Sequence, residues 1–274
     1  MRRCLVEKKN VSVERWELDL EPALDYARRE GLVELVGDSA KSAAGIYKTV
    51  DPSNLDPYGP EWDDLVRLHK LARRRRVLNV LEFGCGHSSL VFSDALFKNR
   101  LEYGDFVRSN LRRSDPFRLD VVDDMKNFLE NTARRIPDNL RNIARFHHSP
   151  VEMTEFDGRI CTRYLTLPNV CPDLIYLDGP SQHSVLGDIS GITTASPDRV
   201  PMASDILRIE HFLLPGTLIL IDGRTANARF LAANFQRSWT YSEDLEADVH
   251  YFELTEEPLG PYNRRQLEFC LARE

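Results

Sequence analysis

The chain has 274 residues, and its 42% hydrophobic content is enough to form one sizeable core. The net charge is −7, and an acidic surface repels nucleic-acid phosphates and anionic lipids, which disfavours a general role on nucleic acid or a membrane. Five scattered cysteines without a CxxC pair argue for a reducing compartment, and against a disulfide framework or a zinc site.

The first residues lack the apolar core of a signal peptide. The most apolar stretch, 212–221, contains Pro215-Gly216 and is far shorter than the roughly 20 residues of a membrane-spanning helix. We therefore expect a cytoplasmic protein.

The N-terminal part of the chain reads as helical. Residues 12–36 place Trp16, Leu20 and Leu24 on one face of a helix. Turn signals fill residues 49–60, and a second helix is expected over 61–75, with acidic residues at its start and arginines at its end. We therefore expect a helical N-terminal extension over 1–60 and a cofactor-binding unit over 61–274.

From Val77 onward, short apolar strands alternate with helices. Strands are expected at 77–83, 117–122, 142–148, 173–178, 217–222, 239–242 and 249–254. Helices are expected at 88–99, 125–136, 202–212 and 225–237, with an inserted loop at 100–116 and a long connection at 182–204. The alternation predicts an α/β fold with a doubly wound, mostly parallel, seven-stranded sheet.

Acidic residues lie at the ends of four of these strands: Glu82, Asp123, Asp178 and Asp222. In an open parallel sheet, ligands bind beyond the carboxyl ends of the strands. Clustered carboxylates repel one another, so a binding site explains this pattern more simply than fold stability does.

The first strand is followed by a glycine loop. Gly84 and Gly86 precede a helix, and glycine there permits a tight turn and close approach of a ligand to the backbone. A dinucleotide-binding loop needs a third glycine where this chain has Ser89. The carboxylate of Glu82 would repel a pyrophosphate but attract a cationic amino group, so the loop favours a zwitterionic, positively charged cofactor.

Asp123 ends the second strand, where a carboxylate accepts hydrogen bonds from ribose hydroxyls in nucleoside-binding α/β folds. The distance along the chain from Gly86 is longer than usual, so Asp124 and Asp120 remain alternatives. A further interpretation is that Asp123 only complements the positive end of the next helix.

In this order the motifs resemble those of the class I S-adenosylmethionine-dependent methyltransferase family, over about residues 61–255. Leu81–Ser89 is similar to the first motif of the family, Asp173–Pro180 to its fourth-strand motif, and Leu214–Asp222 to its Pro-Gly and fifth-strand segment. The two late strands fit the antiparallel hairpin that ends the family's sheet. The resemblance implies a Rossmann-like methyltransferase fold and S-adenosylmethionine as cofactor.

The resemblance also implies residue roles. The methionine part of the cofactor would meet the loop residues Glu82, Gly84, Cys85, Gly86 and Ser88. The ribose would meet Asp123, the adenine Ser149 and Val151, and the cofactor also Asp178, while Asp222 and Arg224 would face the substrate. Cys85 lacks any Cys-His-Asn signature, so we interpret it as a small residue between two glycines.

Small-molecule O-methyltransferases that use a metal carry an aspartate after the fourth strand and Asp-Asn after the fifth. Asp178 fits this pattern, but Asp222 is followed by Gly223-Arg224, with Asn227 further on. We therefore expect no metal. His147 and His148 point to opposite faces of a strand and are not expected to share one either.

His183 lies five residues after Asp178, in the connection expected to cross the acceptor side, and is the first candidate for a general base. An ordinary polar loop histidine is the alternative.

The predicted function is methylation of a small-molecule or sugar-type acceptor, most simply at oxygen. A non-catalytic cofactor-binding protein and, disfavoured by Glu82 and Ser89, an NAD-binding oxidoreductase are the alternatives. Homo-oligomerisation is left open.

Overall fold

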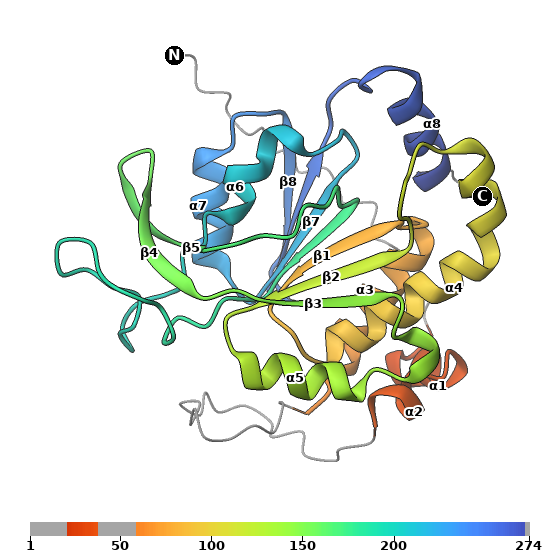
Figure 1. Ribbon diagram of the computed structural model, residues 1–274, viewed down its shortest axis with the longest axis horizontal. Coiled ribbons are helices and arrows are strands. Elements are labelled where there is room, and N and C mark those ends of the chain that lie inside the picture. The colour runs from red at the N-terminus through yellow and green to blue at the C-terminus, as the bar shows by residue number, and fades with distance from the viewer. Residues whose placement is uncertain (1–20, 38–58, 272–274) are drawn as a thin grey trace.

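The predicted α/β sheet is present in the computed structural model, which describes residues 21–37 and 59–271 (Figure 1). The sheet has seven strands in the order β3-β2-β1-β6-β7-β9-β8. Its strands are β1 (Asn79–Phe83), β2 (Arg118–Asp123), β3 (Ala144–His148), β6 (Leu174–Leu177), β7 (Leu218–Asp222), β8 (Trp239–Asp244) and β9 (Val249–Leu254). All neighbours pair in parallel except β9, which is antiparallel to both β7 and β8. The predicted fold class is therefore confirmed, including the antiparallel hairpin at one edge.

Helices cover both faces of the sheet, as a doubly wound fold requires. They are α1 (Ala23–Arg29), α2 (Leu32–Val36), α3 (Trp62–Arg74), α4 (His87–Asn110), α5 (Lys126–Arg135), α6 (Asp205–Ile209), α7 (Thr225–Asn234) and α8 (Gly260–Cys270), with 3-10 turns η1 (Asp138–Leu140) and η2 (Glu210–Phe212). In the part of the chain that the structure describes, no helix combines the length and apolar character needed to cross a bilayer.

The central strands are apolar because both of their faces are buried. Alternate residues of β1, β6 and β7 face opposite sides, so Phe83 and Ile221 join a core with α6 and α7 while Val80 and Leu220 join a core with α3 and α4. All residues of β1 and β6 are buried. These two cores fix the level of the strand ends.

The region 100–116, expected to be a loop, instead continues the helix that follows β1. α4 runs to Asn110 because its second half packs on α8: Val107 is fully buried, and Phe106 stacks on Phe269 with ring centroids 5.3 Å apart. Most of the remaining side chains of this half are solvated, so the apolar pattern is too sparse to reveal a helix.

Two elements were not expected at all. β4 (Val151–Phe156) and β5 (Arg159–Tyr164) form a separate antiparallel hairpin, which stands out from the body of the molecule at the left of Figure 1. Its two-residue turn, Asp157-Gly158, has positive φ at both positions, which is the conformation that an Asp-Gly pair favours. The other is α8, whose sequence signal is Pro261 in the first turn.

The expected helix over 12–36 is described only from residue 21 onward, so Trp16 and Leu20 lie outside the described residues. The described part is two short helices rather than one, because Gly31 adopts a left-handed conformation with φ +75° between α1 and α2. The division of the chain at residue 60 stays a prediction.

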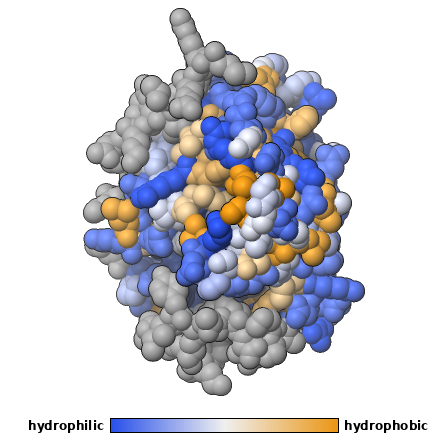
Figure 2. Space-filling model, turned by 90° about the vertical axis from the view of Figure 1, so that its left-hand side faces the viewer, coloured by the Kyte–Doolittle hydropathy of each residue, from blue (hydrophilic) through white to orange (hydrophobic). Residues whose placement is uncertain are grey.

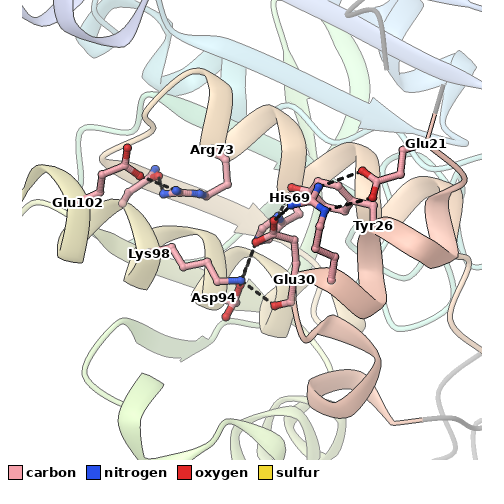
Figure 3. A network of polar contacts seen from close by, with 10 residues as sticks. Glu21, Tyr26, Glu30, His69, Arg73, Asp94, Lys98 and Glu102 are labelled. Atoms are coloured by element: carbon pink, nitrogen blue, oxygen red, sulfur yellow. Dashed lines mark hydrogen bonds and ion pairs between the residues drawn. The ribbon is translucent and has the colours of Figure 1, made fainter. Parts of the chain in front are cut away.

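A buried polar network joins α1 to α3 and α4 (Figure 3). The ring of His69 on α3 is fully buried, and its Nε2 lies 2.9 Å from Asp94 Oδ2 while its Nδ1 lies 2.8 Å from the Tyr26 hydroxyl. Lys98 contacts Asp94 at 2.8 Å and Glu30 at 3.0 Å. Burial lowers the pKa of His69, although the Asp94 carboxylate opposes this, so the ring is neutral near pH 7. Nε2–H then donates to the carboxylate, and Nδ1 accepts from Tyr26.

Replacing Tyr26 by phenylalanine should therefore loosen the N-terminal helices. The variant keeps the ring but leaves His69 Nδ1 buried without a donor, which should lower the free energy of unfolding by about 1–3 kcal/mol. Urea unfolding followed by circular dichroism measures this loss. The matched control is Tyr262→Phe, at a tyrosine that is 54% exposed, and should change stability little. Equal stability of the two variants would contradict the role of the network.

Candidate functional site

The carboxyl ends of four neighbouring parallel strands meet at one edge of the sheet. The register pairs Phe83 of β1 with both Val122 of β2 and Leu177 of β6, and pairs Leu177 with Ile221 of β7. The residues at these ends therefore lie level with one another. This edge carries the four acidic residues that the sequence analysis singled out: Glu82, Asp123, Asp178 and Asp222.

Glu82 is fully buried beneath the start of α4. Its two carboxyl oxygens lie 2.5 Å from Ser88 Oγ and 2.7 Å from Ser89 Oγ. Burial raises the pKa of Glu82 to about 8, the serine hydroxyls oppose the shift, and the Asp178 and Asp123 carboxylates add to it. Glu82 is thus largely protonated near pH 7 and binds the first residues of α4, while the cation-binding role expected of it stays a prediction.

Ser89 is a site residue that the sequence analysis treated only as a missing glycine. Its hydroxyl accepts from Gly86 N–H at 3.3 Å and donates to Glu82, so it links the glycine loop to the buried acid. A serine three residues after a helix-capping glycine is the signal that could have identified it.

The two glycines of the loop have different roles. Gly84 has φ +97°, and a Cβ there would lie 3.0 Å from the backbone nitrogen of Gly179, which follows β6. A Cβ on Gly179 would lie 2.6 Å from Gly84 N. Gly84 is therefore required by backbone contact between β1 and β6, and its expected contact with a ligand stays a prediction. Its replacement by valine would strain the fold.

Gly86 is the position that faces open space. It has extended φ of 169°, and a Cβ there would meet no atom within 4 Å. A side chain at Gly86 would therefore project from the loop without disturbing the protein around it.

Asp123 and Asp124 lie side by side after β2. Asp123 is 8% exposed, and its Oδ1 accepts from Met125 N–H at 2.7 Å, so it does hold the start of α5. Burial raises its pKa to about 6, with the Met125 N–H opposing and the Asp124 carboxylate adding to the shift.

Asp124 Oδ1 accepts from Ser181 N–H at 3.2 Å, while its buried Oδ2 has no hydrogen-bond partner among the described residues. Asp120 is bound instead to Arg118 of its own strand and to His147 of the neighbouring strand β3.

The turn after β6 is held by Arg224. The guanidinium of Arg224 donates to the carbonyl of Asp178 and, at 3.1 Å, to that of Pro180. The Asp178 side chain is 59% exposed. Desolvation by the surrounding protein raises its pKa to about 7; Arg224 opposes this shift, and Asp222 and Asp123 add to it. Because so much of the side chain is accessible, water screens part of the shift. Arg224 thus supports the turn, and its contact with a substrate stays a prediction.

The edge extends onto α3. Asp222 Oδ2 accepts from the Tyr176 hydroxyl at 2.9 Å. Burial raises the pKa of Asp222, and the Asp64 carboxylate adds to this. A hydrogen bond with Asp64 raises the pKa of Glu61, and burial and the charges of Asp64 and Asp222 add to that shift. The sequence predicted the acidic start of this helix but not its proximity to Asp222.

The remaining predicted residues differ in exposure. His183 is exposed, and its backbone N–H donates to Ser181 Oγ at 3.2 Å. Ser149 is fully buried, with its Oγ accepting from Thr166 N–H at 2.9 Å, and Val151 is fully buried in the core. The roles expected of these three residues at the acceptor and the adenine stay predictions.

Cys85 is half-buried, and burial raises the pKa of its thiol, with the Asp123 carboxylate contributing. The group is therefore a thiol rather than a thiolate, which agrees with its interpretation as a small residue in the loop.

The long connection at 182–204 is present and is tied to the hairpin. Leu186 exchanges main-chain hydrogen bonds with Val151 and Met153 of β4, and Ser204 N–H donates to Thr162 O of β5 at 3.0 Å. Figure 2 views the side of the molecule on which the hairpin stands, and hydrophobic side chains gather near the middle of that face. Leu186 is 53% exposed.

Among the described residues, no group of three or more histidine, cysteine, aspartate or glutamate side chains is arranged to hold a metal ion. Asn227, the displaced metal-ligand candidate, is buried and bonds both main-chain groups of Ala203. His147 and His148 have separate partners, Asp120 and the carbonyl of Asp124.

No protein-family model and no curated protein matches the chain. Several solved methyltransferases match its structure. The O-methyltransferase TomG from Streptomyces achromogenes, in complex with SAM, is 18% identical, and the match covers 72% of this chain and 82% of TomG with a TM-score of 0.39. An O-methyltransferase from Bacillus cereus, in complex with SAH, is 12% identical, with 89% and 95% covered and a TM-score of 0.37. Human methyltransferase-like protein 13, also in complex with SAH, is 13% identical, with 77% and 92% covered and a TM-score of 0.35. The fold assignment rests on the strand order and pairing described above.

The buried acid makes stability depend on pH in a defined direction. A carboxyl whose pKa is about 8 in the folded protein and near its ordinary 4.5 when unfolded stabilises the fold below pH 4.5 and loses this contribution as the pH rises through 8. The neutral variant Glu82→Gln should lack this loss, which amounts to at most about 1.4 kcal/mol per pH unit. We expect the melting temperature of the variant to fall less than that of the parent between pH 5 and 8. Parallel curves for the two proteins would show that Glu82 titrates normally.

Proposed function

We propose that the chain is an S-adenosylmethionine-dependent methyltransferase that methylates an oxygen atom of a small-molecule or sugar-type acceptor. The observation that carries the proposal is the edge at which the β1 loop, the acidic residues after β2, and the turn after β6 converge. A non-catalytic protein that retains cofactor binding is the rival proposal, since a fold alone does not establish chemistry.

The residues at this edge suit the charge of the cofactor. S-adenosylmethionine carries an ammonium and a sulfonium. Burial, with a smaller contribution from neighbouring carboxylates, raises the pKa values of Glu82, Asp123 and Asp178, and a bound cation would favour their charged forms. The buried Asp124 Oδ2 is a hydrogen-bond acceptor without a partner among the described residues, which suits a ribose hydroxyl. Gly86 leaves open space above the loop.

The protein's part in the reaction is mainly placement. The cofactor supplies a methyl group bonded to a sulfonium, which is already reactive toward an oxygen nucleophile. The chain aligns the two reactants and excludes alternative geometries, which is worth several kcal/mol of the barrier. In the proposal Asp178 meets the cofactor, Asp222 and Arg224 face the acceptor, and His183 is the base that removes the hydroxyl proton. The proposal includes no metal ion.

The decisive experiment is titration calorimetry with S-adenosylhomocysteine and, separately, NAD. The parent should bind the first and not the second, and Gly86→Val should weaken binding by about tenfold or more because its side chain fills ligand space. The matched control is Gly104→Ala in α4, where a Cβ meets only Arg100 Cγ at 3.9 Å, and binding should be unchanged. No heat with S-adenosylhomocysteine on folded parent protein would refute the proposal.

A separate test concerns the base. His183→Ala should lower turnover by on the order of a hundredfold or more, once an acceptor is known, and leave the affinity for S-adenosylhomocysteine unchanged. His211→Ala, at another exposed histidine, serves as the control and should turn over like the parent. If His183→Ala also turns over like the parent, the proton leaves by another route.

A further inference from the structure

A row of hydrogen-bonding side chains lies under the start of α7, beside the edge described above. His250 of β9 is buried; its Nε2 is 3.0 Å from Thr225 Oγ1, and its Nδ1 is 2.8 Å from the Tyr241 hydroxyl. Both ends of the row are carboxylates: Thr225 Oγ1 is 3.2 Å from Asp248 Oδ1, and the Tyr241 hydroxyl is 2.9 Å from Glu243 Oε2. Five side chains are thus joined by four contacts.

The hydrogens in this row can be counted. The two carboxylates contribute none, each hydroxyl contributes one, and the imidazole contributes one when neutral and two when charged. A neutral His250 therefore leaves three hydrogens for four contacts, whichever ring nitrogen carries its own. With Nδ1–H donating to Tyr241, the Thr225 hydroxyl can donate either to His250 or to Asp248, but not to both. With Nε2–H donating to Thr225, it is the Tyr241 hydroxyl that can donate either to His250 or to Glu243, but not to both. A second ring hydrogen completes the row.

Charges on three elements face the ring. Glu243 of β8 and Asp248 of the β8–β9 turn favour the charged imidazole, while Arg229 of α7 opposes it. Burial is the largest effect and lowers the pKa of His250, so the ring is neutral near pH 7 and the row is one hydrogen short there. Acidification supplies the missing hydrogen.

The row is connected to the proposed site through two consecutive residues. Gly223 N–H donates to the carbonyl of Asp248 at 2.9 Å, and Arg224 donates to the carbonyls of Asp178 and Pro180. Thr225 follows directly as the first residue of α7. The position of the β7–α7 turn, which carries Asp222 and Arg224, is therefore set jointly by the β8–β9 turn and by the turn after β6.

We infer that neutral His250 carries its hydrogen on Nδ1 and that His250 is a positioning residue: its second ring hydrogen, on Nε2, lets Thr225 bind His250 and Asp248 together, which fastens the β7–α7 turn at the edge of the site. The effect on the reaction rests on the proposed function. The fastening of the β7–α7 turn does not rest on that function, because it is a property of the protein without ligand.

The first arm of the test is nuclear magnetic resonance on the unliganded full chain, from about pH 5 to 8. The backbone amides of Gly223, Arg224 and Thr225 should shift with the titration midpoint of the His250 ring. In Thr225→Val the ring should still titrate, but these amides should no longer follow it. In Tyr241→Phe the aromatic packing on Phe252 remains, and the His250 midpoint should fall by about 0.5–1 pH unit, the worth of one net hydrogen bond. Amides that ignore the His250 midpoint, or follow it equally in Thr225→Val, would overturn the inference.

The second arm compares the affinity for S-adenosylhomocysteine, and turnover once an acceptor is known, across the same pH range. For the parent, the plot of affinity or turnover against pH should show an inflection at the titration midpoint of His250. His250→Gln should lack it, because a side-chain amide donates to Thr225 at every pH, while the control His211→Gln should keep it. A parent that binds no S-adenosylhomocysteine refutes the proposed function and leaves the first arm to decide the fastening. A parent that binds, with the same profile in His250→Gln, refutes the positioning role alone.

Discussion

Backbone contact between Gly84 and Gly179 lets the ends of β1 and β6 approach more closely than any side chain would permit. On one side of this contact, the glycine loop is held to Glu82 through Ser89. On the other side, the turn after β6 is fixed by Arg224 and by Asp124. The pKa values of the carboxyl groups around the contact rise together, chiefly because burial penalises their charged forms and in addition because the groups lie close to one another. Packing of two strands thus creates the electrostatic character of the site.

The sequence predicted the sheet well because its strands are buried on both faces and leave continuous apolar runs, as in Ile219 to Ile221. It failed where packing is one-sided or local. In the second half of α4, Val107 packs in a cluster with Leu78, Phe117 and Phe269 of α8, a helix that was itself not expected. Few of its neighbours in the helix are buried, so the apolar pattern was too sparse to reveal this half. The β4–β5 hairpin was missed although Asp157-Gly158 is a strong turn signal, because its two strands are only partly buried and leave no continuous apolar run.

The site was predicted at the level of strand ends but not of individual contacts. Which edge carries the acids follows from the alternation of elements alone. That both oxygens of Glu82 face serines, or that Arg224 binds the carbonyls of Asp178 and Pro180, depends on side-chain directions that no spacing encodes. Gly84 illustrates the difference, because a glycine needed for strand contact and one that leaves space for a ligand look identical in sequence.

The β4–β5 hairpin has a root and a tip with different freedom to change. Val151, Cys161 and Tyr164 belong to the core beneath α6 and α7, whereas the Asp157-Gly158 turn lies at the far end of the two strands. Chimeras that replace part of this hairpin should therefore keep Val151, Cys161 and Tyr164 and exchange only the residues next to the Asp157-Gly158 turn. Under that rule the residues next to the turn can vary in sequence while the sheet and its core stay unchanged.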